Sequence, residues 1–137
     1  MSGRIEKEKD AIIKKFNNSL RKLLKCVEQV TNDSEIEKAR MAAGQALAIN
    51  DLIAINQMGP YLFKYKEKIF AGDVDYFLEA DLSKEITTSD SSVSIDSIIP
   101  KIRTAWKKCN EDEQSALYDI IHTMTTLYIE YVLLEKS

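Results

Sequence analysis

The segment Asp73–Asp81 is the first candidate for chemistry because it contains four carboxylates within a short stretch. Calcium-binding loops of the EF-hand type begin with acidic ligands at positions one, three and five and have an invariant glycine at position six. A loop starting at Asp73 would place Phe77 at the third ligand position and Leu78 at the glycine position. The pattern therefore fails as a calcium site. We predict instead that Asp73 caps a helix and that the other acids form a solvated rim.

The single histidine, His122, and the two cysteines, Cys26 and Cys109, are the other candidate ligands or nucleophiles. Zinc sites need several such residues at short characteristic spacings, and none stands at such a spacing here. The sequence also contains no glycine-rich phosphate loop and no nucleophile elbow. We therefore predict no catalytic residue, no metal site and no cofactor, and we expect both cysteines to be reduced, half-buried thiols.

The composition is typical of one globular domain kept in a reducing compartment. The chain has 137 residues, of which 45% are hydrophobic, and a net charge of -3. At this size a core forms without disulfides or metal, and a dedicated nucleic-acid binder would usually be basic. There is no apolar signal segment and no run of about 18 apolar residues that would span a membrane. We expect a cytoplasmic location, not a secreted protein.

The N-terminal part of the chain departs from this overall charge. From Arg4 to Lys25, eight basic residues accompany three acidic ones. A helix with such a face binds phosphates of nucleic acid or a membrane surface in other proteins. Aromatic residues for base stacking are missing apart from Phe16, which belongs to the apolar stripe. A solvated face is favoured, with nucleic-acid binding as the alternative for the basic residues Lys14, Lys15, Arg21, Lys22 and Lys25.

Hydrophobic periodicity predicts helices along most of the chain. Apolar residues recur at steps of three, four and seven over residues 5–31, up to the polar turn at 31–33. A second, alanine-rich helix begins at Asp33 or Ser34 and extends to about Ile55, with two polar residues at 50–51 that bend it or face water. Gly59 is expected to end it, and Pro60 to begin a third helix that runs to Phe70.

The second half of the chain has a polar interval and two more helices. Gly72 ends the third helix, and residues 76–78 form one further helical turn. Residues 83–95 are predicted to be a mobile polar loop, and a fourth helix starts near Ser94 or Asp96. Asn110 and Glu113 have capping-box spacing at the start of a fifth helix that runs close to the C-terminus. The predicted fold is all-α: residues 1–137 form a single-domain irregular bundle of about five helices.

The chain contains six tyrosines, a generous number for its length. Tyrosine offers a large apolar ring and a polar hydroxyl group, and it is enriched at protein interfaces. Most of the aromatic residues are expected in the core. We predict that a few are exposed to a protein partner, and Tyr61, Tyr65 and Tyr131 are the candidates.

The order of several short patterns resembles a group of known proteins. F-x-x-x-L-x-x-L-L at 16–24 is followed by P-Y-L-x-x-Y-x-x-x-I at 60–69 and G-D-x-D-Y-F-L-E-x-D at 72–81, then by I-x-x-x-W at 102–106 and L-Y-x-I-I at 117–121. Over about residues 12–131 the chain is similar to uncharacterised small helical proteins of large double-stranded DNA viruses of algae and protists. The resemblance implies a viral protein, located in the virion or cytoplasm, that is a minor virion component or an assembly factor.

Together these patterns favour a non-enzymatic structural or protein-interaction protein. It would act through an exposed helix face, on a protein partner or on further copies of itself as a homo-oligomer. The alternative is a nucleic-acid-associated regulatory protein that docks through the basic first helix. An enzyme would need an enclosed pocket that brings His122 or the acids of Asp73–Asp81 to a second reactive group, and no spacing predicts one.

Overall fold

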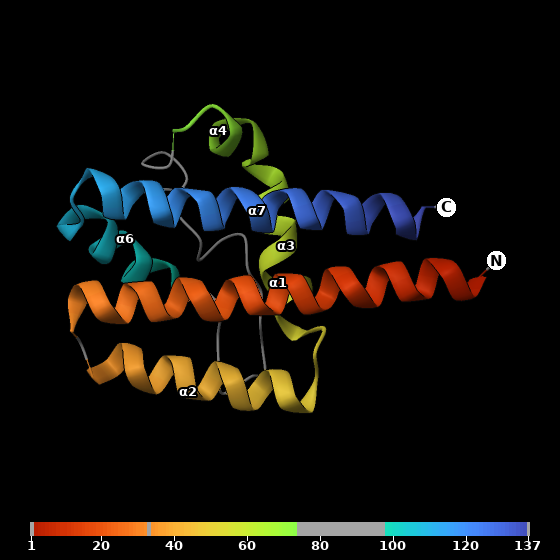
Figure 1. Ribbon diagram of the computed structural model, residues 1–137, viewed down its shortest axis with the longest axis horizontal. Helices are drawn as coiled ribbons and strands as arrows, with labels where there is room; N and C mark the ends of the chain where they lie inside the picture. Colours follow the sequence, from red (N-terminus) through yellow and green to blue (C-terminus); the bar gives the residue numbers. More distant parts are fainter. Residues whose placement is uncertain (1, 33, 74–97, 137) are drawn as a thin grey trace.

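The computed structural model describes residues 2–32, 34–73 and 98–136 (Figure 1). The predicted all-α class is confirmed, since these residues contain six helices and no strand. The predicted turn at 76–78, the loop at 83–95 and the start of the fourth helix lie outside the described residues. The helices are α1 (Ser2–Thr31), α2 (Ser34–Ile49), α3 (Ile53–Lys64), α4 (Lys66–Phe70), α6 (Ile98–Lys108) and α7 (Glu111–Glu135).

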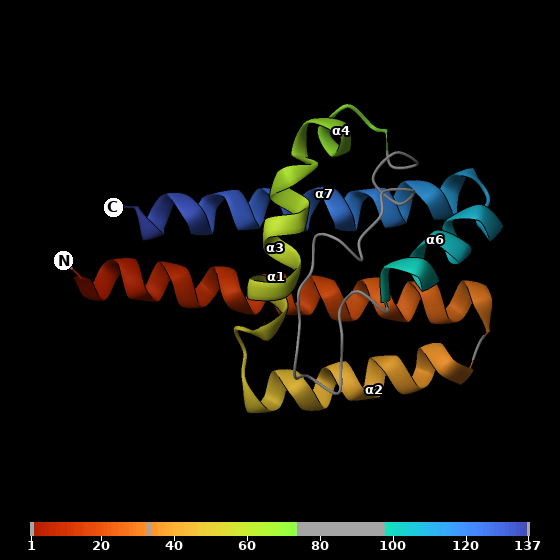
Figure 2. The ribbon, with the colours of Figure 1, turned by 180° about the vertical axis from the view of Figure 1, so that it is seen from behind.

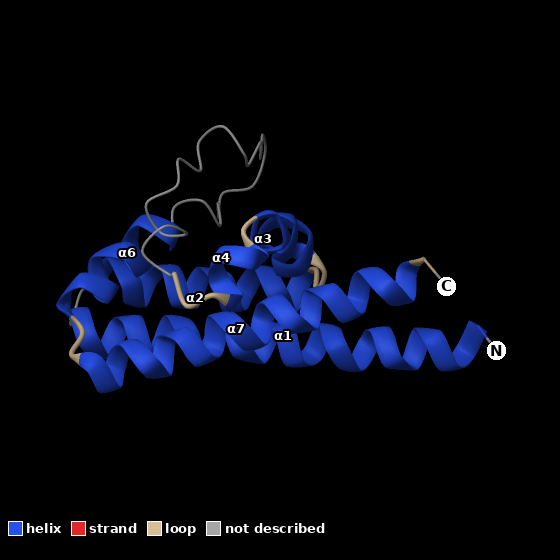
Figure 3. Cartoon of the chain, turned by 90° about the horizontal axis from the view of Figure 1, so that it is seen from above, coloured by secondary structure: helices blue, strands red, loops and turns tan. Residues whose placement is uncertain are grey.

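The long helices α1 and α7 form the centre of the bundle. They run antiparallel and side by side, so that both chain termini lie at the same end (Figure 1). Helix α2 returns along α1, and α3 crosses both long helices at a steep angle, as the view from behind shows (Figure 2). Seen from above, α3 lies as a second layer over the long helices (Figure 3). Helix α6 packs on α1, and α4 packs on α7.

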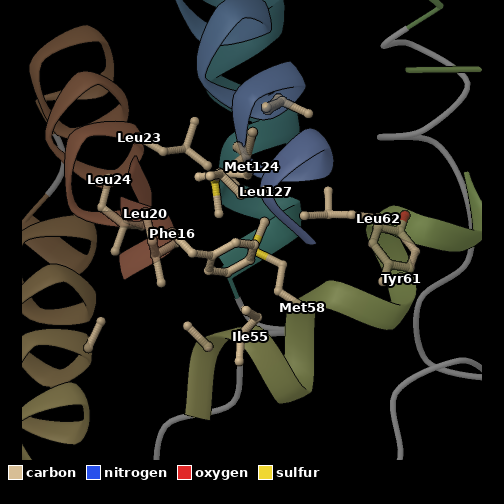
Figure 4. Close-up of a cluster of buried hydrophobic side chains, with 14 of the residues drawn as sticks. Phe16, Leu20, Leu23, Leu24, Ile55, Met58, Tyr61, Leu62, Met124 and Leu127 are labelled. Atoms are coloured by element: carbon tan, nitrogen blue, oxygen red, sulfur yellow. The ribbon is translucent and has the colours of Figure 1, made fainter. Parts of the chain in front are cut away.

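The predicted apolar stripe of the first helix is the main wall of the core. Phe16, Leu23 and Val27 are fully buried, and Leu20 is almost so. The side chains of Phe16 and Leu23 point into the space between α1, α3 and α7, where Met58 meets the ring of Phe16 (Figure 4). A helix with one apolar face is stabilised mainly by burying that face against its neighbours. The 3.6-residue period of the sequence therefore predicted the buried side of α1 correctly.

The predicted second helix is in fact two helices separated by a turn at residues 50–52. The Asn50 side chain accepts a hydrogen bond from the Leu52 amide at 3.0 Å, and the Ile53 amide donates to the Asn50 carbonyl at 3.2 Å. Asn17, buried in α1, donates its side-chain amide to the Asp51 carbonyl at 2.9 Å. Asparagine stabilises turns in this way because its side chain competes with helical hydrogen bonds. The long-range bond from α1 holds the turn in place.

The prediction that Gly59 and Pro60 separate two helices is wrong. Both residues lie inside α3, and the chain breaks later, at Tyr65, whose φ of -103° and ψ of 17° separate α3 from α4. Proline at position 60 leaves the carbonyl of Asn56 without its helical amide donor. Asn56 and Pro60 are both exposed, so water can hydrogen-bond to that carbonyl. The helix therefore tolerates this proline.

The predicted helix ends are confirmed at two places. Asn110 accepts from the Glu113 amide at 2.8 Å, and the Glu113 carboxylate accepts from the Asn110 amide at 3.0 Å, which is a complete capping box at the start of α7. Gly72 has a φ of +83°, a left-handed conformation that favours glycine, directly after α4. No helix in the described part of the chain combines the length and the apolar character that a membrane span requires.

Candidate functional site

Two of the three tyrosines predicted to face a partner are buried. Tyr61 and Tyr131 expose 3% and 7% of their surface, whereas Tyr65 is half-buried. Tyr61 shares a face of α3 with the buried residues Ile55 and Met58 (Figure 4), and its ring meets Tyr65 edge-on, 5.0 Å between centroids. The prediction of exposed rings is therefore wrong for Tyr61 and Tyr131. Each of these rings has enough apolar area to fill core space.

Tyr131 instead joins α7 to α1. The ammonium nitrogen of Lys9 lies 5.4 Å from the centre of its ring, a cation–π contact between the two helices. Burial, together with a hydrogen bond to Glu135, raises the pKa of Tyr131 to about 12. Burial disfavours the charged phenolate, so the phenol stays protonated and donates to the Glu135 carboxylate. Its role in this structure is to hold the bundle together.

The exposed aromatic side chains lie elsewhere, where α3 and α4 meet α7. Phe63 and Phe70 expose 38% and 42% of their surface, and their neighbours on α7 are the exposed His122 and the half-buried Tyr118 and Tyr128. Ring centroids are 6.2 Å apart between Phe63 and Tyr128, 5.0 Å between Phe70 and His122, and 5.8 Å between Tyr118 and His122. These contacts form two groups, Phe63 with Tyr128 and Phe70 with His122 and Tyr118, and we call the five residues together the aromatic surface. It is the candidate functional site.

Because Gly59 has no side chain, the ring of Tyr128 can pack against α3. A Cβ atom at Gly59 would lie 2.8 Å from Cζ of Tyr128 and closer still to Cδ1 and Cε1. The ring of Tyr128 therefore lies directly on the backbone of α3, where it also stacks on Tyr131 with centroids 6.3 Å apart. This close approach of α3 and α7 brings Phe63 beside Tyr128.

Positive charge borders the aromatic surface. The ammonium nitrogen of Lys66 lies 4.1 Å from the centroid of the Phe63 ring. Lys64 has a similar contact with Tyr65, at 5.6 Å. A cation over the face of an aromatic ring is attracted to its negative charge distribution. The surface thus combines apolar rings with adjacent cations.

The five residues of the basic face of α1 are all exposed: Lys14, Lys15, Arg21, Lys22 and Lys25. Arg21 donates to the side chain of Asn18 at 3.1 Å. The four lysines make no ion pair within the described part of the chain. Glu28, the one acid that follows these residues on α1, is paired with Arg40 of α2. The structure therefore leaves this face as a row of solvated positive charges.

The other candidates for chemistry in the described residues are His122 and the two cysteines. His122 contacts aromatic rings, and no group of three potential metal ligands occurs in the described residues. Cys26 and Cys109 are half-buried thiols that form no disulfide. Burial, followed by the charges of Glu113 and Cys26, raises the pKa of Cys109. A raised pKa keeps a thiol protonated and weakens it as a nucleophile.

Comparison of the chain with known protein families, with curated proteins and with solved structures finds no match. The likeness to proteins of large DNA viruses stays a prediction from the sequence.

Proposed function

We propose that this protein is a non-enzymatic interaction protein that binds a protein partner through the aromatic surface. The observation that supports this most is the exposure of two phenylalanine rings, Phe63 and Phe70, on neighbouring helices. Exposed aromatic area is unfavourable in water, and aromatic residues are enriched at the centres of protein interfaces. Tyr118 and Tyr128 extend the apolar area and add hydroxyl groups that can hydrogen-bond to a partner.

The charges around the surface indicate what kind of partner it fits. Lys66 lies over the ring of Phe63. Residues 64–68 contain two further lysines, Lys64 and Lys68, and one acidic residue, Glu67. Complementary charges at the edge of an interface favour the correct partner and speed association. The partner we propose presents an apolar centre edged by carboxylates. The order of these charges along α3 and α4 would then fix its orientation.

The biological setting we propose rests on the sequence resemblance alone. In that setting the protein is a minor component of a viral particle or an assembly factor in the infected cell. Mass spectrometry of purified particles tests the first possibility. Co-purification with assembly intermediates, without incorporation into mature particles, would indicate the second. A coding origin in a cellular genome with no viral neighbourhood would contradict both.

The test of the aromatic surface is a double substitution, Phe63→Ser with Phe70→Ser. We expect it to weaken binding of a partner isolated from the native source by at least about tenfold, because central aromatic residues often contribute more than 1 kcal/mol each. The matched control is Met41→Ser with Ile49→Ser, which removes two apolar side chains that are 55% and 88% exposed on α2. Titration calorimetry with the purified partner measures both. Equal affinity of the wild type and the Phe63/Phe70 variant would refute the proposed surface.

The unpaired lysines on α1 favour one second candidate, a nucleic-acid-associated regulatory role. Lys14, Lys15, Lys22 and Lys25 are exposed along one helix without ion-pair partners in the described residues. Phosphate contacts by such residues make affinity fall steeply with salt. We therefore expect binding to duplex DNA or RNA to weaken as salt rises, and Lys22→Gln with Lys25→Gln to reduce that salt dependence. Affinity that does not change with salt would rule out this role for the basic face.

A further inference from the structure

The end of the bundle that carries both termini has an open groove distinct from the aromatic surface. Here α1 and α7 extend past the other helices (Figures 1 and 3). The groove between them has a volume of about 450 Å³. It is lined by Glu8, Ala11, Ile12 and Lys15 from α1 and by Glu130, Leu133 and Leu134 from α7. Its walls therefore come from two antiparallel helices, and no residue of another helix lines it within the described part of the chain.

The groove is apolar along its middle. Leu133 exposes 61% of its surface, Ala11 is exposed, and Leu134 is half-buried. Ile12 is 8% exposed and belongs both to the lining of the groove and to the hydrophobic core. Exposed apolar residues beside polar ones mark interaction surfaces. The small side chain of Ala11 allows another helix to approach closely at this point.

The charges of α1 that line the groove are complementary to those of a second copy of α1. On α1 the acid Glu8 and the base Lys15 stand seven residues apart, roughly 10 Å along the helix, with Ala11 and Ile12 between them. Consider a two-fold axis that is perpendicular to α1 and passes between Ala11 and Ile12. It brings Glu8 of each copy next to Lys15 of the other copy. This face of α1, with an acid at one end, a base at the other and apolar residues between them, is therefore complementary to itself when two copies of α1 pack antiparallel.

The existing contacts leave these charges available. Lys15 has no ion pair within the described residues, and the contact of Glu8 with Arg4, at 3.4 Å, is between exposed groups and contributes little. Glu130 of α7 is exposed and also lines the groove.

We infer that a second copy of this chain docks in the groove, so that two α1–α7 pairs form a four-helix dimer interface with two-fold symmetry. Such an interface uses the same surface on both copies, so each ion pair occurs twice. Two antiparallel helix pairs that bury their shared apolar face form a common and stable arrangement. This inference does not depend on the partner proposed for the aromatic surface.

Charge reversal tests the dimer, with mass in solution measured by sedimentation equilibrium over a range of concentrations. We expect the wild type to dimerise, and Glu8→Lys or Lys15→Glu alone to raise the dissociation constant by about tenfold or more, because each reversal replaces two attractive contacts by two repulsive ones. An equimolar mixture of the two variants restores a dimer, since one then carries only bases and the other only acids at these positions. The double variant, Glu8→Lys with Lys15→Glu, also dimerises.

Three results would overturn the inference. The first is a wild type that stays monomeric at its highest soluble concentration. The second is a dimer whose dissociation constant is the same in both single variants, which would place the interface on another face. The third is a mixture of the single variants that stays as monomeric as each alone. The Phe63→Ser and Phe70→Ser variant is expected to dimerise normally, so failure of the dimer and failure of the aromatic surface are distinguishable.

Discussion

Replacing Phe16 by alanine is expected to lower the free energy of unfolding by about 3–5 kcal/mol. The ring of Phe16 has no solvent exposure and lies where α1 meets α3, next to Met58 (Figure 4). Removing it takes away the free energy of burying the ring and leaves a cavity that the surrounding helices fill incompletely. Because small domains are stable by only about 5–15 kcal/mol, the loss is a large fraction of the total.

Urea denaturation followed by circular dichroism measures this loss. The matched control is Phe70→Ala, which removes the same side chain from a position that is 42% exposed. We expect that control to change stability by less than about 1 kcal/mol. Similar losses for the two variants would mean that Phe16 does not lie at the centre of the core.

Replacing Gly59 by alanine is expected to destabilise the protein by about 1–3 kcal/mol, even though alanine is the better helix former. The added methyl group would overlap with the ring of Tyr128 on α7. That ring is packed against Phe63 and Tyr131, so it can move away only by disturbing both contacts. Overpacking of this kind outweighs the gain of up to about 1 kcal/mol in helix propensity.

Two controls isolate this contact. Gly44→Ala, in α2, adds a methyl group with no atom within 4 Å and is expected to stabilise the protein by up to about 1 kcal/mol. In a background of Tyr128→Ala the ring is absent, so Gly59→Ala should no longer destabilise. A double-mutant cycle from urea denaturation gives the coupling energy. A loss at Gly59 that persists without the Tyr128 ring would contradict the packing argument.

Much of the local structure was predictable from short-range patterns. The capping box at Asn110, the stop at Gly72 and the buried stripe of α1 all depend on residues within a few positions of one another. At the turn around Asn50, the sequence predicted only that the polar residues 50–51 bend a helix or face water. The outcome depended on Asn17, which lies 34 positions before Asp51 and donates a hydrogen bond to the Asp51 carbonyl. A hydrogen bond over that separation leaves no periodic trace in the sequence.

Exposed aromatic residues were predicted from the sequence, but two of the three tyrosines named are buried and the exposed rings are Phe63 and Phe70. With the third helix predicted to start at Pro60, the first seven residues of α3, about two turns, were assigned to the preceding segment, so the buried side of α3 was not defined. Starting at Ile53, the helix shows a buried side through Met58 and Leu62, and Phe63, about 100° further round, falls outside it. Phe63 could have been recognised as an aromatic residue off the apolar stripe, had the start of the helix been known.

The sequence by itself determined that this chain is helical, which face of the first helix is apolar, and that one helix ends near Gly72 and another begins at Asn110. Those properties follow from propensity, periodicity and capping, which act within about four residues. The tertiary structure decided that Gly59 serves as a contact point for Tyr128, that Tyr61 and Tyr131 are buried, and that Phe63 and Phe70 are exposed. An apolar stripe specifies that a face must be covered, but which neighbour covers it depends on how the helices pack together.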